Sequence, residues 1–288
     1  MKCSSLSLRA FNTGGFFELR LPNGKTILID PCFSHLDPIT REWTTQYETG
    51  HTREDIGAAD YILLTHTHWD HDLDIGYFVE KYGSLVFCSH ACAEELLKYH
   101  KIPYDKIVCC YPGSRYTLDD FTLEVLQGKH NPEGTRTFQE PCLLGEKAGA
   151  FGHSRLDQLG NMYSLDWFLT TNNHFSVLMA GGMVLWNDIF DFCREKRPNL
   201  LLRQSGVRRD GAQVPPEELA ALFLRYHAQL VIPYHQEGMI KKHGQDWTHA
   251  YFRDVDACIR RADPGMALMY PETGQWYDIG IDISAVPR

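Results

Sequence analysis

Several protein classes are excluded by what this sequence lacks. No apolar run among its 288 residues approaches the roughly 18 consecutive residues that cross a membrane as a helix. No basic run exceeds two residues, and the formal net charge is −9. Nonspecific binding to nucleic acid or to an anionic membrane requires clustered Lys and Arg, so we expect neither partner. A small-molecule substrate is the expected partner, and the sequence predicts no particular oligomeric state.

The cysteine pattern is not that of a disulfide framework or of a zinc finger. The nine cysteines are an odd number, and no two of them have the CxxC spacing. Such scattered cysteines are typical of reduced, buried thiols in a cytosolic protein. The opening residues, MKCSSLSLRAF, contain no apolar segment of the kind found in secretory signals. We therefore expect a cytoplasmic location.

Strand and helix patterns alternate along both halves of the chain. The first half predicts strands at 6–11, 16–21, 25–30, 61–65, 85–89, 106–111 and 121–130, and helices at 72–83 and 90–100. The second half predicts strands at 174–180, 183–188, 199–204, 230–235, 265–270 and 274–279, and helices at 189–197, 215–227 and 248–262. Strands 174–180 and 183–188 would form a hairpin around a Gly-Gly turn.

This order predicts the architecture. Strands followed by strand–helix alternation in each half favour two sheets packed face to face, with helices outside. Hydrophobic residues make up 43% of the chain, enough for a large core, and we read residues 1–288 as a single domain. Two segments, 31–56 and 131–165, show little periodicity, and loops this long are usually functional or disordered. We expect both loops to frame a cleft.

The stretch YILLTHTHWDHDLDIGYF, residues 61–78, contains the strongest candidate site. A strand pattern runs directly into His66, His68, Asp70 and His71. Neutral imidazoles and carboxylates are ligands for zinc, manganese and iron, and a chance polar loop rarely has this spacing. Four ligands within six residues are too crowded for one ion. They can divide between two adjacent ions.

Three further candidates each follow a predicted strand. His130 follows FTLEVLQGK, Asp188 follows MVLWN, and His235 follows LVIPY. Taken alone, a His after a strand is more often a hydrogen-bonded side chain, and an Asp there is often a helix N-cap. Polar residues at the ends of apolar strands can nevertheless gather at one sheet edge, where loops form a cleft.

Together, these motifs resemble the metallo-β-lactamase fold superfamily. The resemblance rests on HTHWDH, QGKH, GGMVLWND and VIPYH, which follow in this order over most of the chain. The segments KTILIDP and PPEELAALFLRYHAQLVIPYH are most similar to its lactonase-like and uncharacterised metal-dependent hydrolases. The resemblance implies an α/β fold, the four-layer αββα sandwich.

The resemblance also implies a dinuclear metal site. Six residues would hold the two cations separately: His66, His68 and His130 for one, and Asp70, His71 and His235 for the other. Asp188 would bridge them, with Asp191 the nearest alternative because Asn187 precedes Asp188 where the family usually has Gly. The cofactors would be two divalent metal ions, with zinc the first expectation and manganese or iron the alternatives.

Two adjacent cations imply hydrolysis. They lower the pKa of a bridging water, so that a metal-bound hydroxide can attack a lactone or ester of a small polar substrate. Asp70 is the candidate catalytic residue, because it would lie beside both the hydroxide and the leaving group and could carry a proton between them. Cys32, in the motif DPCFSH, is close to the expected cleft in sequence, and we expect it to have a structural role.

Other functions stay open at this point. The same metal pair would serve a phosphodiesterase acting on a small phosphodiester. A mononuclear iron oxygenase of the persulfide dioxygenase type is an alternative of another class. A module that has lost catalysis is disfavoured, because buried ligands retained without a metal would repel one another. Loop residues that could line the cleft are His35, Arg136, His153 and Arg155.

Overall fold

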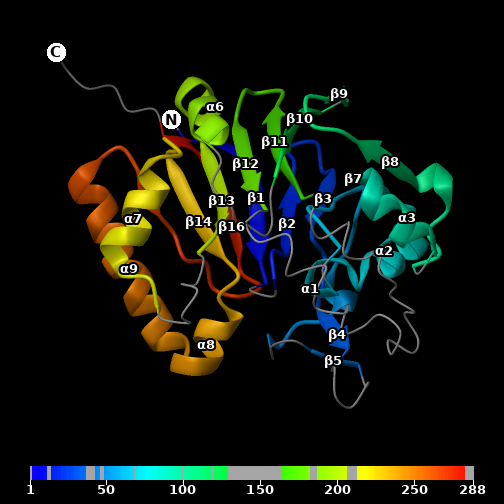
Figure 1. Cartoon of the computed structure of the whole chain (residues 1–288), viewed down its shortest axis with the longest axis horizontal. Helices are drawn as coiled ribbons and strands as arrows, with labels where there is room; N and C mark the ends of the chain where they lie inside the picture. Colours follow the sequence, from blue (N-terminus) through cyan, green and yellow to red (C-terminus); the bar gives the residue numbers. More distant parts are fainter. Residues whose placement is uncertain are drawn as a thin grey trace.

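The fold is known from a computed structural model (Figure 1). It describes residues 2–11, 14–36, 43–45, 49–67, 69–98, 100–118, 120–128, 164–181, 187–205 and 213–282. Two seven-stranded sheets account for most of its strands.

The first sheet has the strand order β16-β1-β2-β3-β6-β7-β8. Its members are β1 (Lys2–Ala10), β2 (Phe17–Arg20), β3 (Thr26–Ile29), β6 (Tyr61–Leu63), β7 (Leu85–Ser89), β8 (Ile107–Cys110) and β16 (Trp276–Asp282). The pairings of β1, β2 and β16 are antiparallel, whereas β3, β6, β7 and β8 run parallel. The carboxyl ends of these parallel strands therefore meet at one edge of the sheet.

The second sheet has the order β15-β14-β13-β12-β11-β10-β9. Its members are β9 (Arg115–Thr117), β10 (Phe121–Gln127), β11 (Leu165–Thr171), β12 (Ser176–Ala180), β13 (Leu200–Gln204), β14 (Leu230–Tyr234) and β15 (Ala267–Leu268). Strands β12, β13, β14 and β15 are parallel, so their carboxyl ends also share an edge.

Helices cover the outer face of each sheet (Figure 1). The helices are α1 (Trp69–Asp72), α2 (Ile75–Tyr82), α3 (His90–Lys98), α6 (Asn187–Lys196), α7 (Pro216–Leu224), α8 (Glu237–His243) and α9 (Gln245–Ala262), with 3-10 turns η1 (Arg53–Asp55) and η2 (Tyr104–Lys106). Apolar residues of α2 and α3 pack on the first sheet, and those of α6, α7 and α9 pack on the second. Helix α2 ends at Gly83, whose φ of 70° only glycine adopts readily.

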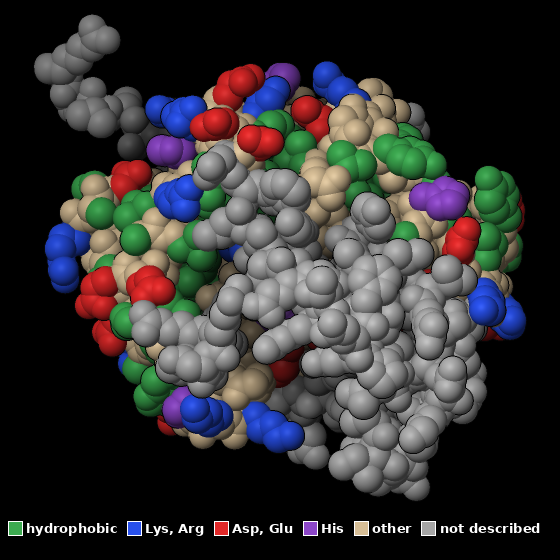
Figure 2. Space-filling model, viewed as in Figure 1, with side chains coloured by type: hydrophobic (Ala, Val, Ile, Leu, Met, Phe, Trp, Pro, Cys, Tyr) green, Lys and Arg blue, Asp and Glu red, His purple; other side chains and the backbone are tan. Residues whose placement is uncertain are grey.

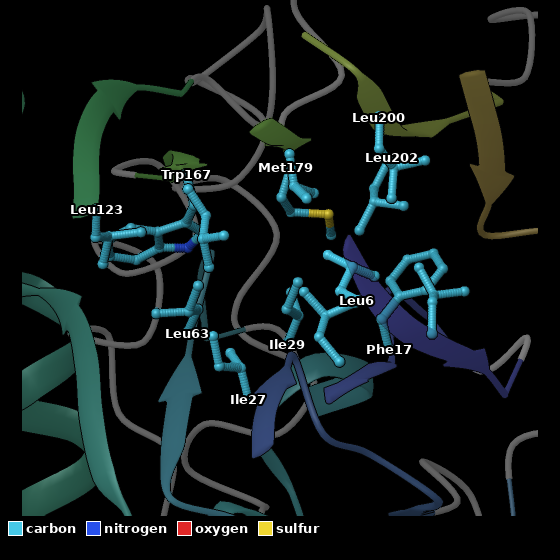
Figure 3. Packing of buried hydrophobic residues seen from close by; sticks show 14 of the residues in the cluster. Leu6, Phe17, Ile27, Ile29, Leu63, Leu123, Trp167, Met179, Leu200 and Leu202 are labelled. Carbon is cyan, nitrogen blue, oxygen red and sulfur yellow. The ribbon is translucent and has the colours of Figure 1, made fainter. Parts of the chain in front are cut away.

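The main core lies between the two sheets. Figure 3 shows Leu6, Ile29 and Leu63 of the first sheet facing Trp167 and Met179 of the second. Helix–sheet–sheet–helix is the four-layer α/β sandwich, so the predicted fold class is confirmed.

Three sequence predictions about elements were wrong. Strand β11 begins at Leu165, inside the segment expected to be a loop, and the segment 31–56 contains the hairpin β4 (Ser34–Leu36) and β5 (Trp43–Thr45). Strand β12 does not form a hairpin with 183–188. Its two sides are taken by β11 and β13, and residues 187–188 begin helix α6. Most of the loop 131–165 lies outside the described residues.

Two further observations concern the length of the helices and the charge of the surface. None of the described helices is both long and apolar enough to cross a membrane. On the face shown in Figure 2, Lys and Arg side chains are interspersed with Asp and Glu rather than gathered in one patch.

Candidate metal centre

Strand ends from both sheets bring the candidate ligands together. Asp30 follows β3 and His66 lies just beyond the end of β6, and these two strands are parallel neighbours. The chain then enters α1, which contains Asp70 and His71. His235 follows β14 of the second sheet. Figure 1 shows α1 and α8, the helices next to these strand ends, at the same edge of the sandwich.

One cluster contains Asp70, His71 and His235. A ligand atom from each lies within 4.8 Å of the others. The Nε2 atom of His235 is 3.3 Å from Asp70 Oδ2, and the Nε2 atom of His71 is 3.8 Å from the same oxygen. Both imidazoles thus point their Nε2 atoms at one carboxylate, as ligands around a shared cation would.

A second cluster contains Asp30, His66 and His71. Its ligand atoms also lie within 4.8 Å of one another, and all three residues are buried. The rings of His66 and His71 have centroids 4.1 Å apart. His71 therefore belongs to both clusters, and the two clusters form one continuous site.

The carboxylate of Asp30 fixes the tautomers of two histidines. Its Oδ2 atom accepts hydrogen bonds from His71 Nδ1 at 2.8 Å and from the Thr65 hydroxyl at 2.6 Å. Because that hydroxyl hydrogen is used on Asp30, the contact of 2.8 Å between Thr65 Oγ and His66 Nδ1 requires His66 to be the donor. In their neutral forms, both histidines therefore keep the hydrogen on Nδ1 and carry the lone pair on Nε2.

The surroundings of the Nε2 atom of His71 are the feature of the site that best fits a metal ion. His71 is 1% exposed, and this nitrogen has no hydrogen-bond partner in the part of the chain that the structure describes. A buried polar atom without a partner is costly, and native structures rarely leave one without a reason. A divalent cation between His71, Asp70 and His235 would satisfy it.

The carboxylates also set the charge of the site. Burial alone would lower the pKa of His71, but Asp70 and Asp30 raise it above its ordinary value. Burial likewise opposes protonation of His235, whereas Glu237 and Asp70 raise its pKa well above the ordinary value. The buried imidazole of His71 and the partly buried imidazole of His235, both beside carboxylates, make a site that strongly favours positive charge, whether from protons or from a metal ion.

Gly14 lies directly against Asp70 and close to His71. It has a φ of 52°, and a side chain there would collide with the backbone carbonyl oxygen of Asp70. The same added carbon would lie 3.8 Å from His71 Nε2. Its neighbour Gly15 leaves little more room, because a side chain there would lie 3.2 Å from Asp30 Oδ2. The close approach of this loop to α1 therefore requires glycine.

Part of the chain matches known proteins in sequence. A family model described as a β-lactamase superfamily domain matches residues 25–145. A UPF0173 metal-dependent hydrolase from Myxococcus xanthus is 30% identical over 115 residues, which cover 40% of this chain and 36% of that protein. A similar protein from Staphylococcus aureus is 27% identical, and the match covers 44% of this chain and 50% of its length. The chain thus spans half or less of the curated relatives it matches.

Solved structures match over nearly the whole chain. The metallo hydrolase Igni18 from Ignicoccus hospitalis has a TM-score of 0.66 at 14% identity, and the match covers 97% of this chain and 99% of that one. CmlA, a diiron β-hydroxylase from Streptomyces venezuelae, has a TM-score of 0.59 at 14% identity, with 95% of this chain and 54% of that one covered. Together with the metallo-β-lactamase fold protein YhfI from Bacillus subtilis, which has a TM-score of 0.59 at 12% identity over 94% of this chain and 98% of that one, these matches show that the chain has the metallo-β-lactamase fold.

The structure places four of the seven predicted superfamily ligands in the site. These are His66, Asp70, His71 and His235. His68 and His130 lie outside the described residues. Asp188 is exposed in the first turn of α6 and belongs to neither described cluster, so its bridging role stays a prediction. The alternative, Asp191, has a side chain that is 62% exposed and pairs with Arg194.

Other acidic residues of the motif region have structural partners. Asp72 contacts His100 Nε2 at 3.1 Å, and Asp74 accepts hydrogen bonds from Phe33 N and from Arg53. Cys32 is fully buried, and burial, followed by the nearby carboxylates of Asp74 and Asp70, raises the pKa of its thiol well above the usual range. This environment disfavours the thiolate form of Cys32.

Sequence reasoning missed three residues of the site. Asp30 ends the motif KTILID, and its position at a strand end was the available signal. Glu237 lies two residues after His235, a spacing that also occurs by chance. Gly14 lies between the predicted strands 6–11 and 16–21, and nothing in its neighbouring residues signals a contact with Asp70. Of the loop residues proposed to line the cleft, His35 lies in β4, and Arg136, His153 and Arg155 are outside the described residues.

Proposed function

We propose that the protein is a metal-dependent hydrolase acting on a lactone or ester of a small polar substrate. One observation carries the proposal: the fully buried Nε2 atom of His71 lacks a hydrogen-bond partner among the described residues and faces Asp70 and His235. The names of the curated relatives, which are metal-dependent hydrolases, support the same reaction class.

The proposed cofactor is a pair of divalent cations, with zinc ahead of manganese and iron. Asp70, His71 and His235 would hold one cation, and this part of the assignment rests on the described cluster. His66 would hold the other through Nε2, because its Nδ1 atom contacts the Thr65 hydroxyl at 2.8 Å. His68, His130 and the bridging Asp188 complete the proposed set by their place in the motifs.

The chemistry follows from the residues around the cations. When bound, two cations lower the pKa of a water molecule and polarise a carbonyl oxygen. Asp70 faces the Nε2 atoms of His71 and His235, where a cation would lie, whereas Asp30 lies behind His71 at its Nδ1 atom, so we assign the contact with the substrate to Asp70. Its Oδ2 atom is positioned to hold a cation, and the carboxylate can pass a proton to the leaving oxygen. Asp30 orients His71 directly and His66 through the Thr65 hydroxyl.

Substitution of Asp70 by Asn tests this role. Asn keeps the size of Asp70 but cannot accept the proton, so turnover should fall by about 100-fold or more, with a smaller change in KM. Steady-state kinetics on metal-loaded protein would measure it, with Asp105→Asn, at an exposed residue, as the matched control. Wild-type turnover in Asp70→Asn would contradict the role of Asp70.

A panel of substrates separates this function from its alternatives. Lactones, simple esters and phosphodiesters would be offered to the same preparation, and a chelator should abolish any turnover. Preferred hydrolysis of phosphodiesters would favour the phosphodiesterase. An iron oxygenase is the second candidate, because CmlA, a protein of similar structure, is a diiron β-hydroxylase. Oxygen consumption with thiol persulfides, without hydrolysis of any ester, would favour it.

A further inference from the structure

His235 lies between two carboxylates. Its Nδ1 atom contacts Glu237 Oε1, and its Nε2 atom lies 3.3 Å from Asp70 Oδ2. The side chains of Glu237 and His235 are 10% and 22% exposed, so the contact between them is largely removed from water. Nothing in the superfamily motifs that predicted the ligands points to Glu237.

The backbone brings Glu237 back onto its neighbour. His235 has a φ of 68°, in the left-handed region that costs free energy for a residue other than glycine. This conformation forms the sharp turn from β14 into α8, whose first residue is Glu237. The turn is anchored by the hydrogen bond from Ile240 N to Gln236 O, at 2.8 Å. A side chain two residues beyond His235 can therefore reach its ring.

The contact decides which nitrogen of His235 can bind a cation. A buried carboxylate accepts a hydrogen bond from Nδ1, so in the neutral imidazole the lone pair lies on Nε2, the nitrogen that faces Asp70. Asp30 does the same for His71 through its contact of 2.8 Å with Nδ1. The two imidazoles that share Asp70 thus each have a buried carboxylate behind them.

We propose that Glu237 is a positioning residue that holds His235 in its metal-binding tautomer and orientation, and so sets the affinity of the cation shared with Asp70 and His71. The inference rests on the metal assignment of the proposed function. A carboxylate hydrogen-bonded to a ligating imidazole orients the ring and makes its free nitrogen a stronger ligand, and losing it typically weakens metal binding by about 10- to 100-fold.

Three variants test the role of Glu237. Glu237→Ala removes the acceptor, and Glu237→Gln keeps a carbonyl acceptor without the charge. Glu272→Gln is the matched control, because Glu272 also contacts a histidine, His249 at 3.5 Å, but its side chain is 57% exposed. Zinc titration of metal-free protein against a chromophoric chelator would resolve the binding events.

We expect Glu237→Ala to weaken one zinc-binding event by about 10- to 100-fold, Glu237→Gln to weaken the same event less, and Glu272→Gln to leave it unchanged. In Co²⁺-loaded protein, the exchangeable Nδ1 proton of a ligating imidazole gives a strongly shifted NMR signal. Glu237→Ala should remove one such signal through faster exchange with water, while the signal of His71, protected by Asp30, remains.

Two outcomes would overturn the positioning role. One is zinc affinity and Co²⁺ spectra of Glu237→Ala equal to those of the wild type. The other is parallel weakening of every binding event together with a lower melting temperature in Glu237→Ala and Glu237→Gln alike, which would show that Glu237 only supports the fold.

These measurements need no substrate, so they are independent of the proposed reaction. Metal loading that follows the expected pattern in a protein that hydrolyses none of the panel would refute the proposed function and leave Glu237 in its role. Ester hydrolysis by the wild type, with metal binding unchanged in Glu237→Ala, would do the reverse.

Discussion

At Gly14 the backbone passes so close to Asp70 that there is no space for a side chain. Gly24 has an even larger φ of 88° but nothing within 4 Å of an added side-chain carbon. Both glycines thus have a positive φ, but only Gly14 has neighbouring atoms that a side chain would meet. A substitution at Gly24 would therefore strain only the backbone, whereas one at Gly14 would also disturb the metal site.

Alanine at each glycine tests this difference. Gly24→Ala should lower the free energy of unfolding by about 1–2 kcal/mol, the cost of a left-handed backbone for a residue with a side chain. Gly14→Ala should lower it further and also weaken zinc binding, because the new methyl group displaces the carbonyl of Asp70. Chemical denaturation and zinc titration of both variants would measure this. Equal zinc affinity in the two variants would contradict a role of Gly14 in the site.

The sequence predicted the residues of the site unequally. His66, Asp70 and His71 lie within six positions, so their proximity follows from the local chain. Asp30 and Glu237 contribute through hydrogen bonds, and these depend on the pairing of β3 with β6 and on the turn after β14. Short motifs carry no information about such contacts between distant segments.

At the scale of elements, strand β11 shows why periodicity failed. Its residues Leu165–Thr171 are buried on both faces of the sheet, so apolar and polar side chains do not alternate. Asp166 interrupts the apolar run, although its carboxylate is buried and accepts a hydrogen bond from Gly181 N at 2.9 Å. The sequence therefore predicted that β12 pairs with the segment after it, 183–188, whereas its antiparallel partner is β11, which precedes it in the chain.

Strand β16 joins the last part of the chain to the first sheet. It pairs with β1 from Lys2 to Arg9, and Ile279 inserts into the core between the sheets at 7% exposure. Ile279→Ala should lower the free energy of unfolding by about 2–3 kcal/mol, and Ile279→Val by about 1 kcal/mol, because the cavity left is smaller. Denaturant unfolding would measure both. Equal stability of the two variants and the wild type would mean that β16 contributes nothing to the core.

At the scale of the whole molecule, the sandwich carries ligands from both sheets to one edge. His66 and Asp30 come from the first sheet, and His235 comes from the second. The order of elements predicted two packed sheets, but not which strands would be neighbours, because pairing depends on contacts far apart in sequence. The geometry of the site therefore depends on how the two sheets pack against each other.

The location of the cations tests the central claim most directly. A crystal structure of zinc-loaded protein, with anomalous scattering recorded at the zinc edge, would place them. We expect two peaks about 3.5–4 Å apart, one of them bound by Asp70 Oδ2 and the Nε2 atoms of His71 and His235. A single peak, or peaks that leave His71 Nε2 without a metal ligand bond at saturating zinc, would contradict the dinuclear site proposed for this protein.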